Sequence, residues 1–218
     1  MIMKQNKINE VNLRVEICGG IAAGKTSLSY LISETRKTVI NESFESNPFI
    51  ESFYKNAAYF SFETEVTFAL QHYHDIKKAA RKNSLIICDF SVFLDLAYAD
   101  VTLNKSEHKA FTSVHNEIVT QIGHPDILIY LKCDPLILRK RIVARNREFE
   151  QGVTVEYLNQ LISALENRIF KLDNLKIIVI DSGKINFIEN HKQYTFDKIQ
   201  KYLNCLSNGM NVDQITYI

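Results

Sequence analysis

Short apolar runs alternate along this chain with longer stretches that repeat with the period of a helix. Five runs have the length and the β-branched content of buried strands: residues 13–18, 38–41, 85–89, 127–132 and 176–181. Residues 27–36 and 157–170 carry leucine and isoleucine at steps of three and four, which predicts amphipathic helices. Asp134 before Pro135 is typical of a helix start, so a further helix is expected to about residue 147. The alternation predicts an α/β fold with a mostly parallel sheet.

The composition is that of an ordinary globular protein. The 218 residues are 46% hydrophobic and 23% charged, and we expect a single domain, residues 1–218, with loosely held ends at 1–12 and 208–218. Lys and Arg number 26 against 25 Asp and Glu, so a net charge of +1 disfavours nucleic acid and acidic membranes as partners. The sequence has no signal-peptide core and no apolar run approaching about 18 residues, which predicts a cytoplasmic protein.

A phosphate-binding loop directly follows the first predicted strand. The chain has only 7 glycines, and three of them fall within residues 19–24. With the next residues they match G-x-x-x-x-G-K-[ST], between an apolar strand and an amphipathic helix as that pattern requires. Backbone N–H groups of such a loop point at phosphate oxygens, aided by the dipole of the following helix. The predicted nucleotide-binding residues are Gly19, Gly20, Ile21, Ala22, Ala23, Gly24, Lys25, Thr26 and Ser27.

The loop predicts that a nucleoside triphosphate binds, but it does not say what is done with it. Lys25 is expected to neutralise charge on the β- and γ-phosphates, and the Thr26 hydroxyl to coordinate Mg²⁺. A GTPase would also carry guanine-reading and switch sequences. The chain has no D-x-x-G, and residues 104–107 read N-K-S-E where N-K-x-D is needed, so the GTPase class is disfavoured.

Three further segments follow in order: N-E-S-F-E-S-N-P-F-I at residues 41–50, P-D-I-L-I-Y-L at 125–131 and R-I-V-A-R-N-R-E-F-E-Q-G at 141–152. With the loop, over about residues 13–205, they resemble the deoxyribonucleoside kinases, the bacterial members more than the animal ones. The resemblance implies a P-loop kinase fold with five parallel strands flanked by helices, an arginine-rich lid and, usually, a homodimer. It also implies ATP and Mg²⁺ as cofactors and a deoxyribonucleoside as the acceptor.

The same resemblance implies the catalytic roles. Glu42, at the end of the second predicted strand, matches the general base that takes the proton of the sugar 5′-hydroxyl. Asp89 ends the third predicted strand and is placed, with Thr26, to hold Mg²⁺ or its water shell. Animal members read Glu-Arg-Ser there, whereas this chain reads Asp89-Phe90-Ser91, so the arginine is missing. Its loss leaves more of the phosphate stabilisation to other cations.

Basic side chains concentrate between residues 132 and 147, where six of them stand against one acid. Arg141 and Arg145 are four apart and share a face of the predicted helix, which suits a clamp on the transferring phosphoryl group. Arg147 matches the second arginine of the family's lid and is expected to contact the substrate.

Other matching positions imply the substrate contacts. Tyr54 and Glu150 correspond to the pair that hydrogen-bonds the sugar 3′-hydroxyl. Phe44 and Phe62 would supply apolar walls for the base. Because the chain has 13 phenylalanines, the alternative is that either ring belongs to the core, and the same alternative holds for Tyr54.

Base recognition is expected to involve Glu63, which stands where the family normally has glutamine. An amide offers one donor and one acceptor, whereas an ionised glutamate offers acceptors only, which suits the N1–H and the exocyclic amine of guanine. Asp95 matches a position near the base associated with purine tolerance, although an exposed helical acid is the alternative. We therefore expect a purine, deoxyguanosine in particular, to be a good substrate and thymidine a poor one.

The expected function is transfer of the γ-phosphate of ATP to the 5′-hydroxyl of a deoxyribonucleoside in nucleotide salvage. Two alternatives share the loop. A nucleoside monophosphate kinase must bind an acceptor phosphate, yet no arginine stands between Glu42 and Ile76 to do so. A non-catalytic ATP-binding regulatory protein would have no need of Glu42, Tyr54 and Glu150.

Overall fold

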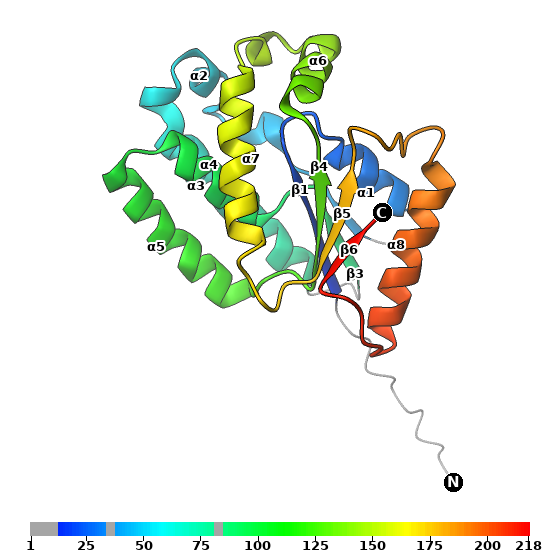
Figure 1. Cartoon of the computed structure of the whole chain (residues 1–218). Coiled ribbons are helices and arrows are strands. Elements are labelled where there is room, and N and C mark those ends of the chain that lie inside the picture. The colour runs from blue at the N-terminus through cyan, green and yellow to red at the C-terminus, as the bar shows by residue number, and fades with distance from the viewer. Residues whose placement is uncertain (1–12, 34–37, 81–84) are drawn as a thin grey trace.

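The computed structural model describes residues 13–33, 38–80 and 85–218, which form a parallel sheet covered by helices (Figure 1). The strands are β1 (Leu13–Gly19), β2 (Thr38–Ile40), β3 (Leu85–Cys88), β4 (Ile127–Lys132), β5 (Ile177–Asp181) and β6 (Ile215–Tyr217). The helices are α1 (Lys25–Ser33), α2 (Ile50–Lys55), α3 (Ala57–Ala80), α4 (Val92–Thr102), α5 (Lys105–Ile122), α6 (Pro135–Arg145), α7 (Val155–Ile169) and α8 (Lys192–Ser207). Two short 3-10 turns are η1 (Phe44–Ser46) and η2 (Glu148–Glu150).

The sheet confirms the predicted α/β class and corrects its strand count. Within the described residues, six strands run parallel in the order β2-β3-β1-β4-β5-β6, whereas five were expected. The sixth is β6, which pairs with β5 at the outer edge, and the Ile218 N–H beyond it donates to the Val179 carbonyl at 3.0 Å. The prediction that residues 208–218 are loosely held is therefore wrong for this strand, and the same prediction for residues 1–12 lies outside the described residues.

Helices cover both faces of the sheet. In Figure 1, α1 and α8 lie together on one face, and α3, α4, α5 and α7 lie on the other. Every residue of β1 is buried, as are the first five residues of β4. Strands buried on both faces read as continuous apolar runs, which is why the sequence identified these two so readily.

The predicted helices form with small differences at their ends. α7 matches the predicted helix 157–170 but ends at Ile169 and begins at Val155, because the Thr154 side chain accepts a hydrogen bond from the Tyr157 N–H and caps the first turn. α6 begins at Pro135 as predicted but ends at Arg145, two residues before the expected end. Asn146 stops it by adopting a left-handed conformation with φ 52°. Residues 34–36 of the predicted helix 27–36 lie outside the described residues.

The carboxyl ends of the strands meet at one edge of the sheet and carry the candidate residues. The phosphate-binding loop follows β1, Glu42 follows β2, and Asp89 directly follows β3. The turn after β3 is anchored from below by Glu16 of β1, whose carboxylate accepts hydrogen bonds from the Ser91 hydroxyl at 2.9 Å and the Val92 N–H at 3.1 Å. Among the described helices, none combines the length and the hydropathy needed to cross a membrane.

Candidate active site

A cavity of about 840 Å³ opens at the carboxyl edge of the sheet. It brings together most of the residues singled out in the sequence. Its lining includes Ile21, Ala22, Ala23, Gly24, Lys25, Thr26, Ser27, Glu42, Phe44, Tyr54, Arg141, Arg145, Arg147 and Glu150. Gly19 and Gly20 precede the part of the loop that lines the cavity. Tyr98 and the segment 182–188 also line it, and neither was predicted, because no motif marks them.

The loop after β1 has the shape of a phosphate cradle. Gly24 has φ +103°, a conformation that residues with a Cβ rarely adopt, and a Cβ there would lie 2.9 Å from the Phe187 ring. α1 begins immediately afterwards, with the Leu28 N–H donating to the Gly24 carbonyl at 2.9 Å, so the positive end of its dipole faces the cavity. The Lys25 ammonium lies 3.4 Å from the Gly19 carbonyl. These residues fit the triphosphate of ATP.

Oxygen ligands suited to Mg²⁺ lie beside the cradle. The Thr26 hydroxyl hydrogen-bonds the Asp89 carboxylate, and the Glu42 backbone N–H donates to the same carboxylate. Burial raises the pKa of Asp89 above its ordinary value, and these two hydrogen bonds oppose the rise. A hydroxyl and a carboxylate are hard oxygen donors of the kind Mg²⁺ prefers, so the pair fits that ion.

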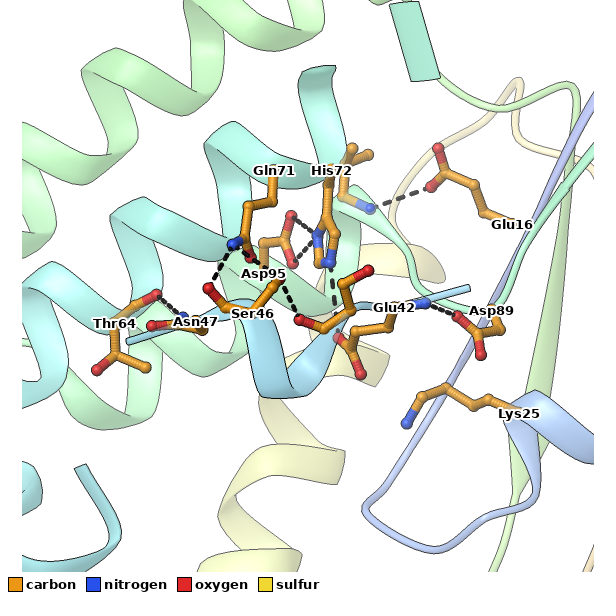
Figure 2. A network of polar contacts seen from close by, with 12 residues as sticks. Glu16, Lys25, Glu42, Ser46, Asn47, Thr64, Gln71, His72, Asp89 and Asp95 are labelled. Carbon is orange, nitrogen blue, oxygen red and sulfur yellow. Dashed lines mark hydrogen bonds and ion pairs between the residues drawn. The ribbon is translucent and has the colours of Figure 1, made fainter. Parts of the chain in front are cut away.

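The Glu42 carboxylate lies between two positive groups (Figure 2). Its Oε1 is 3.6 Å from His72 Nε2, and the Lys25 side chain reaches toward it from the other side. Burial alone would raise the pKa of Glu42, but His72 first, then the charges of Lys25 and Arg147, hold it below its ordinary value. Glu42 is therefore ionised at neutral pH, as a general base must be.

The arginines of the lid form hydrogen bonds and ion pairs with acceptors around the cavity. Arg145 Nε donates to Glu150 Oε2 at 2.6 Å, and Arg147 Nη1 lies 3.4 Å from Glu150 Oε1. Glu150 is 1% exposed, so these two cations balance a buried charge. Arg141 donates to the Ser182 carbonyl at 2.6 Å, which links α6 to the end of β5.

Aromatic rings form the wall between α2 and the lid. Phe44 stacks on Phe149 with ring centres 5.3 Å apart, and Tyr54 lies 5.2 Å from the same ring. Burial raises the pKa of Tyr54, and the Glu150 carboxylate raises it further. Both side chains line the cavity, and their joint contact with the sugar 3′-hydroxyl stays a prediction. The Arg147 guanidinium lies over the Phe44 ring at 5.7 Å. Phe149 was missed, although it stands between two residues that were predicted.

Three predicted base contacts, Phe62, Glu63 and Asp95, are not among the described residues that line this cavity. Phe62 packs instead against an apolar cluster that α3 forms with α4 and α5. The buried face of α3 carries Glu65 and His72. Glu63 lies about 200° around the helix from Glu65, because each residue advances by about 100°. Glu65 therefore shares its helix face with His72, which lies 3.6 Å from Glu42, whereas Glu63 points to another side of α3. Neither carboxyl is part of the cavity lining that the structure describes, and the role of Glu63 in base recognition stays a prediction.

Asp95 and His72 lie on the same side as Glu65. Asp95 is 6% exposed and its carboxylate contacts His72 Nδ1 at 3.0 Å, so the alternative of an exposed acid is excluded. His72 was missed as a site residue, although its spacing of seven from Glu65 places both on one helix face. Glu65 accepts a hydrogen bond from Thr102 Oγ1 at 3.3 Å.

Burial raises the pKa of Glu65 to about 8, and the Asp95 carboxylate adds to the effect. Because this value lies above the ordinary 4.5, the folded state holds a proton that the unfolded state has released, and stability is lost as pH rises from 4.5 to 8. Glu65→Gln cannot ionise. We expect its melting temperature to exceed that of the wild type by about 5 °C or more at pH 8 and by much less at pH 5.

Thermal unfolding followed by circular dichroism at pH 5, 7 and 8 tests this expectation. The matched control is Glu63→Gln, which removes the same charge from the opposite side of α3 and should show no gain that grows with pH. An equal gain at pH 5 and pH 8, or an equal gain in the control, would contradict the protonated state of Glu65.

Comparisons with known proteins identify the family of this chain. A family model described as deoxynucleoside kinase matches residues 15–204. A deoxyguanosine kinase from Bacillus subtilis (strain 168) is 28% identical over 189 residues, which cover 83% of this chain and 91% of that protein. A deoxyadenosine/deoxycytidine kinase from the same organism is 28% identical over 175 residues, which cover 76% and 80%.

Solved structures share the fold. The structure of deoxyadenosine kinase from M. mycoides with bound dCTP has a TM-score of 0.74 and 22% identity, covering 88% of this chain and 99% of that one. The family match spans most of the chain, including the phosphate loop, Glu42 and the lid. The chain therefore belongs to the deoxynucleoside kinase family and is an ATP-dependent deoxynucleoside kinase.

Proposed function

We propose that this kinase phosphorylates the 5′-hydroxyl of a purine deoxyribonucleoside and that deoxyguanosine is its preferred acceptor. The observation that carries the proposal is the buried carboxyl of Glu65, which shares a helix face with His72 beside Glu42. Two relatives support it, because a deoxyguanosine kinase and a deoxyadenosine/deoxycytidine kinase are each 28% identical to this chain.

The chemistry follows from the charges around the cavity. The ionised Glu42 carboxylate accepts the proton of the 5′-hydroxyl as that oxygen attacks phosphorus. Lys25, Arg141 and Arg145 line the cavity and stabilise the charge that develops on the transferring phosphoryl group. Mg²⁺ held by Thr26 and Asp89 would neutralise further charge on the phosphates.

Glu65 favours guanine in either protonation state. Protonated, it donates to O6 and accepts from N1–H; ionised, it accepts from N1–H and the exocyclic amine. Adenine presents an amine donor beside a ring-nitrogen acceptor, so it needs the protonated acid. Because the pKa of Glu65 is raised to about 8, the protonated fraction falls about tenfold between pH 7 and pH 9.

A nucleoside panel tests the proposal. Transfer of labelled γ-phosphate from ATP to deoxyguanosine, deoxyadenosine, deoxycytidine, thymidine and dGMP is measured at pH 7 and pH 9. We expect the highest kcat/KM for deoxyguanosine, and a ratio of deoxyguanosine to deoxyadenosine that rises about tenfold with pH. Glu65→Gln should abolish that rise, whereas Glu63→Gln should keep it.

The other outcomes identify the alternatives. A ratio of deoxyguanosine to deoxyadenosine that does not change with pH would contradict base recognition by Glu65. Transfer to dGMP in preference to nucleosides would indicate a nucleoside monophosphate kinase, and ATP binding without transfer to any acceptor would indicate a non-catalytic protein.

A further inference from the structure

We propose that His72 is a positioning residue that holds and orients the Glu42 carboxylate. Its imidazolium supplies a positive charge beside this carboxylate, which Phe90 cannot do. The inference rests on the proposed role of Glu42 as the general base. It concerns a residue of α3 that does not touch the reacting atoms and acts through Glu42 alone.

The first observation is the placement of the imidazole between two carboxylates (Figure 2). His72 is 3% exposed. Its Nδ1 lies 3.0 and 3.1 Å from the two carboxylate oxygens of Asp95, and its Nε2 lies 3.6 Å from Glu42 Oε1. Asp95, on α4, therefore sets the direction in which the other ring nitrogen points, and that direction is toward Glu42.

The second observation is the packing of the ring. His72 stacks on Phe90 with ring centres 3.8 Å apart and planes 7° apart, and Phe68 lies 5.9 Å away. These aromatic neighbours restrict rotation of the imidazole. Phe90 stands where animal deoxyribonucleoside kinases have arginine. The uncharged Phe90 ring therefore packs against the charged imidazole of His72 and restricts its rotation.

The third observation is that Glu42 is held at both ends. Its backbone N–H donates to the carboxylate of Asp89, the residue before Phe90, and its own carboxylate faces His72. With Oε1 directed at the imidazole, Oε2 remains for the proton of the substrate hydroxyl. Asp89, in the turn after β3, and His72, on α3, thus hold Glu42 from its backbone and from its side chain.

The charges around His72 favour its protonated form. The titratable groups that face it are the carboxyls of Asp95 on α4, Glu42 after β2 and Glu65 on α3, of which Glu65 is protonated below about pH 8. Burial alone would lower the pKa of His72, but Asp95 and Glu42 raise it to about 10. Nε2 makes no hydrogen bond within the described residues, and the Glu42 Oε1 atom that forms an ion pair with it lies 3.6 Å away. Leaving a buried N–H unpaired is costly, which favours its use on Glu42.

A double-mutant cycle tests whether His72 acts through Glu42. Phosphorylation of deoxyguanosine is measured for His72→Gln, Glu42→Gln and the double variant, each with its own KM for ATP. We expect His72→Gln to lower kcat about 10-fold to 30-fold with KM for ATP within about twofold, and to lower kcat less than about twofold further in the Glu42→Gln background. Losses that multiply in the two backgrounds would overturn the inference.

The control variant is His115→Gln. His115 is another buried histidine, 2% exposed, whose Nε2 contacts the Val92 carbonyl at 2.8 Å away from Glu42. Its loss should change kcat less than about threefold. A loss in the control as large as that in His72→Gln would show that any buried histidine matters in this way, and would overturn the inference.

The wild-type protein offers a test that does not depend on folding of a variant. Nitrogen NMR of the imidazole, assigned by comparison with His72→Arg, should show both ring nitrogens of His72 protonated at pH 7.5. A neutral ring at that pH would overturn the inference. The two proposals can fail separately. A Glu42→Gln enzyme with the wild-type kcat would refute Glu42 as the general base. A lowered kcat in Glu42→Gln that falls further, by the full His72→Gln factor, in the double variant would refute only the positioning role of His72.

Discussion

Replacing Glu42 by glutamine should lower kcat for deoxyguanosine about 100-fold or more and leave ATP binding nearly unchanged. The amide has the size of the carboxylate but cannot accept the proton of the 5′-hydroxyl. The position of the phosphate loop does not depend on the Glu42 carboxylate, because its cradle is built from backbone and from Lys25. Steady-state kinetics gives kcat, and calorimetry with ATP gives the dissociation constant.

Glu45→Gln is the matched control for this variant. Glu45 is an exposed carboxylate on η1, three residues from Glu42, and its neutralisation should leave kcat within about twofold. If Glu42→Gln turned over at the wild-type rate, Glu42 would not be the base. If it lost ATP binding to the same extent as kcat, its role would be structural.

Replacing Lys25 by methionine should lower kcat/KM for ATP about 1,000-fold. Methionine keeps the length and the apolar stem of lysine but removes the charge that the cradle aims at the phosphates. The same charge helps to hold the pKa of Glu42 down, after the larger contribution of His72, so its loss weakens the base as well. Both effects act on the chemical step, and we expect kcat to fall more than KM rises.

Lys109→Met controls for the loss of a lysine. Lys109 is exposed on α5, outside the cavity lining, and its replacement should leave kcat/KM within about twofold. Equal melting temperatures for Lys25→Met and the wild type would show that the cradle still folds. A variant that changed KM alone would show that Lys25 binds the ground state of ATP rather than stabilising transfer.

The strands and the phosphate loop could be predicted because each has a local signature. β4 is a continuous apolar run, and the loop combines fixed glycines with a lysine and a threonine. β6 has only three residues, and its apolar face is only half-buried, so no run of sequence distinguishes it from a loop. Its pairing depends on β5, which lies far away in the chain.

The site was predicted best where residues adjacent in sequence act together. Glu63 and Glu65 show where motif matching stops being informative, because a short motif does not say which face of a helix a residue occupies. The spacing of the buried residues along α3 places Glu65 and His72 on one face. Asn146 ends α6 early through a left-handed conformation that asparagine adopts only in some contexts. The homodimer, the cytoplasmic location, the Mg²⁺ ion and the roles of the individual site residues stay predictions.

The short strand β6 has a consequence for how the molecule avoids self-association. β5 is apolar and buried from Ile177 to Ile180, and without β6 its N–H and C=O groups would form an open edge. Open apolar edges are templates for pairing with strands of other chains, which leads to aggregation. β6 covers that edge with three residues and leaves Tyr217 exposed at the rim. A strand that the sequence alone did not reveal thus replaces the apolar edge of β5 by an edge of three residues, which offers less backbone for pairing with other chains.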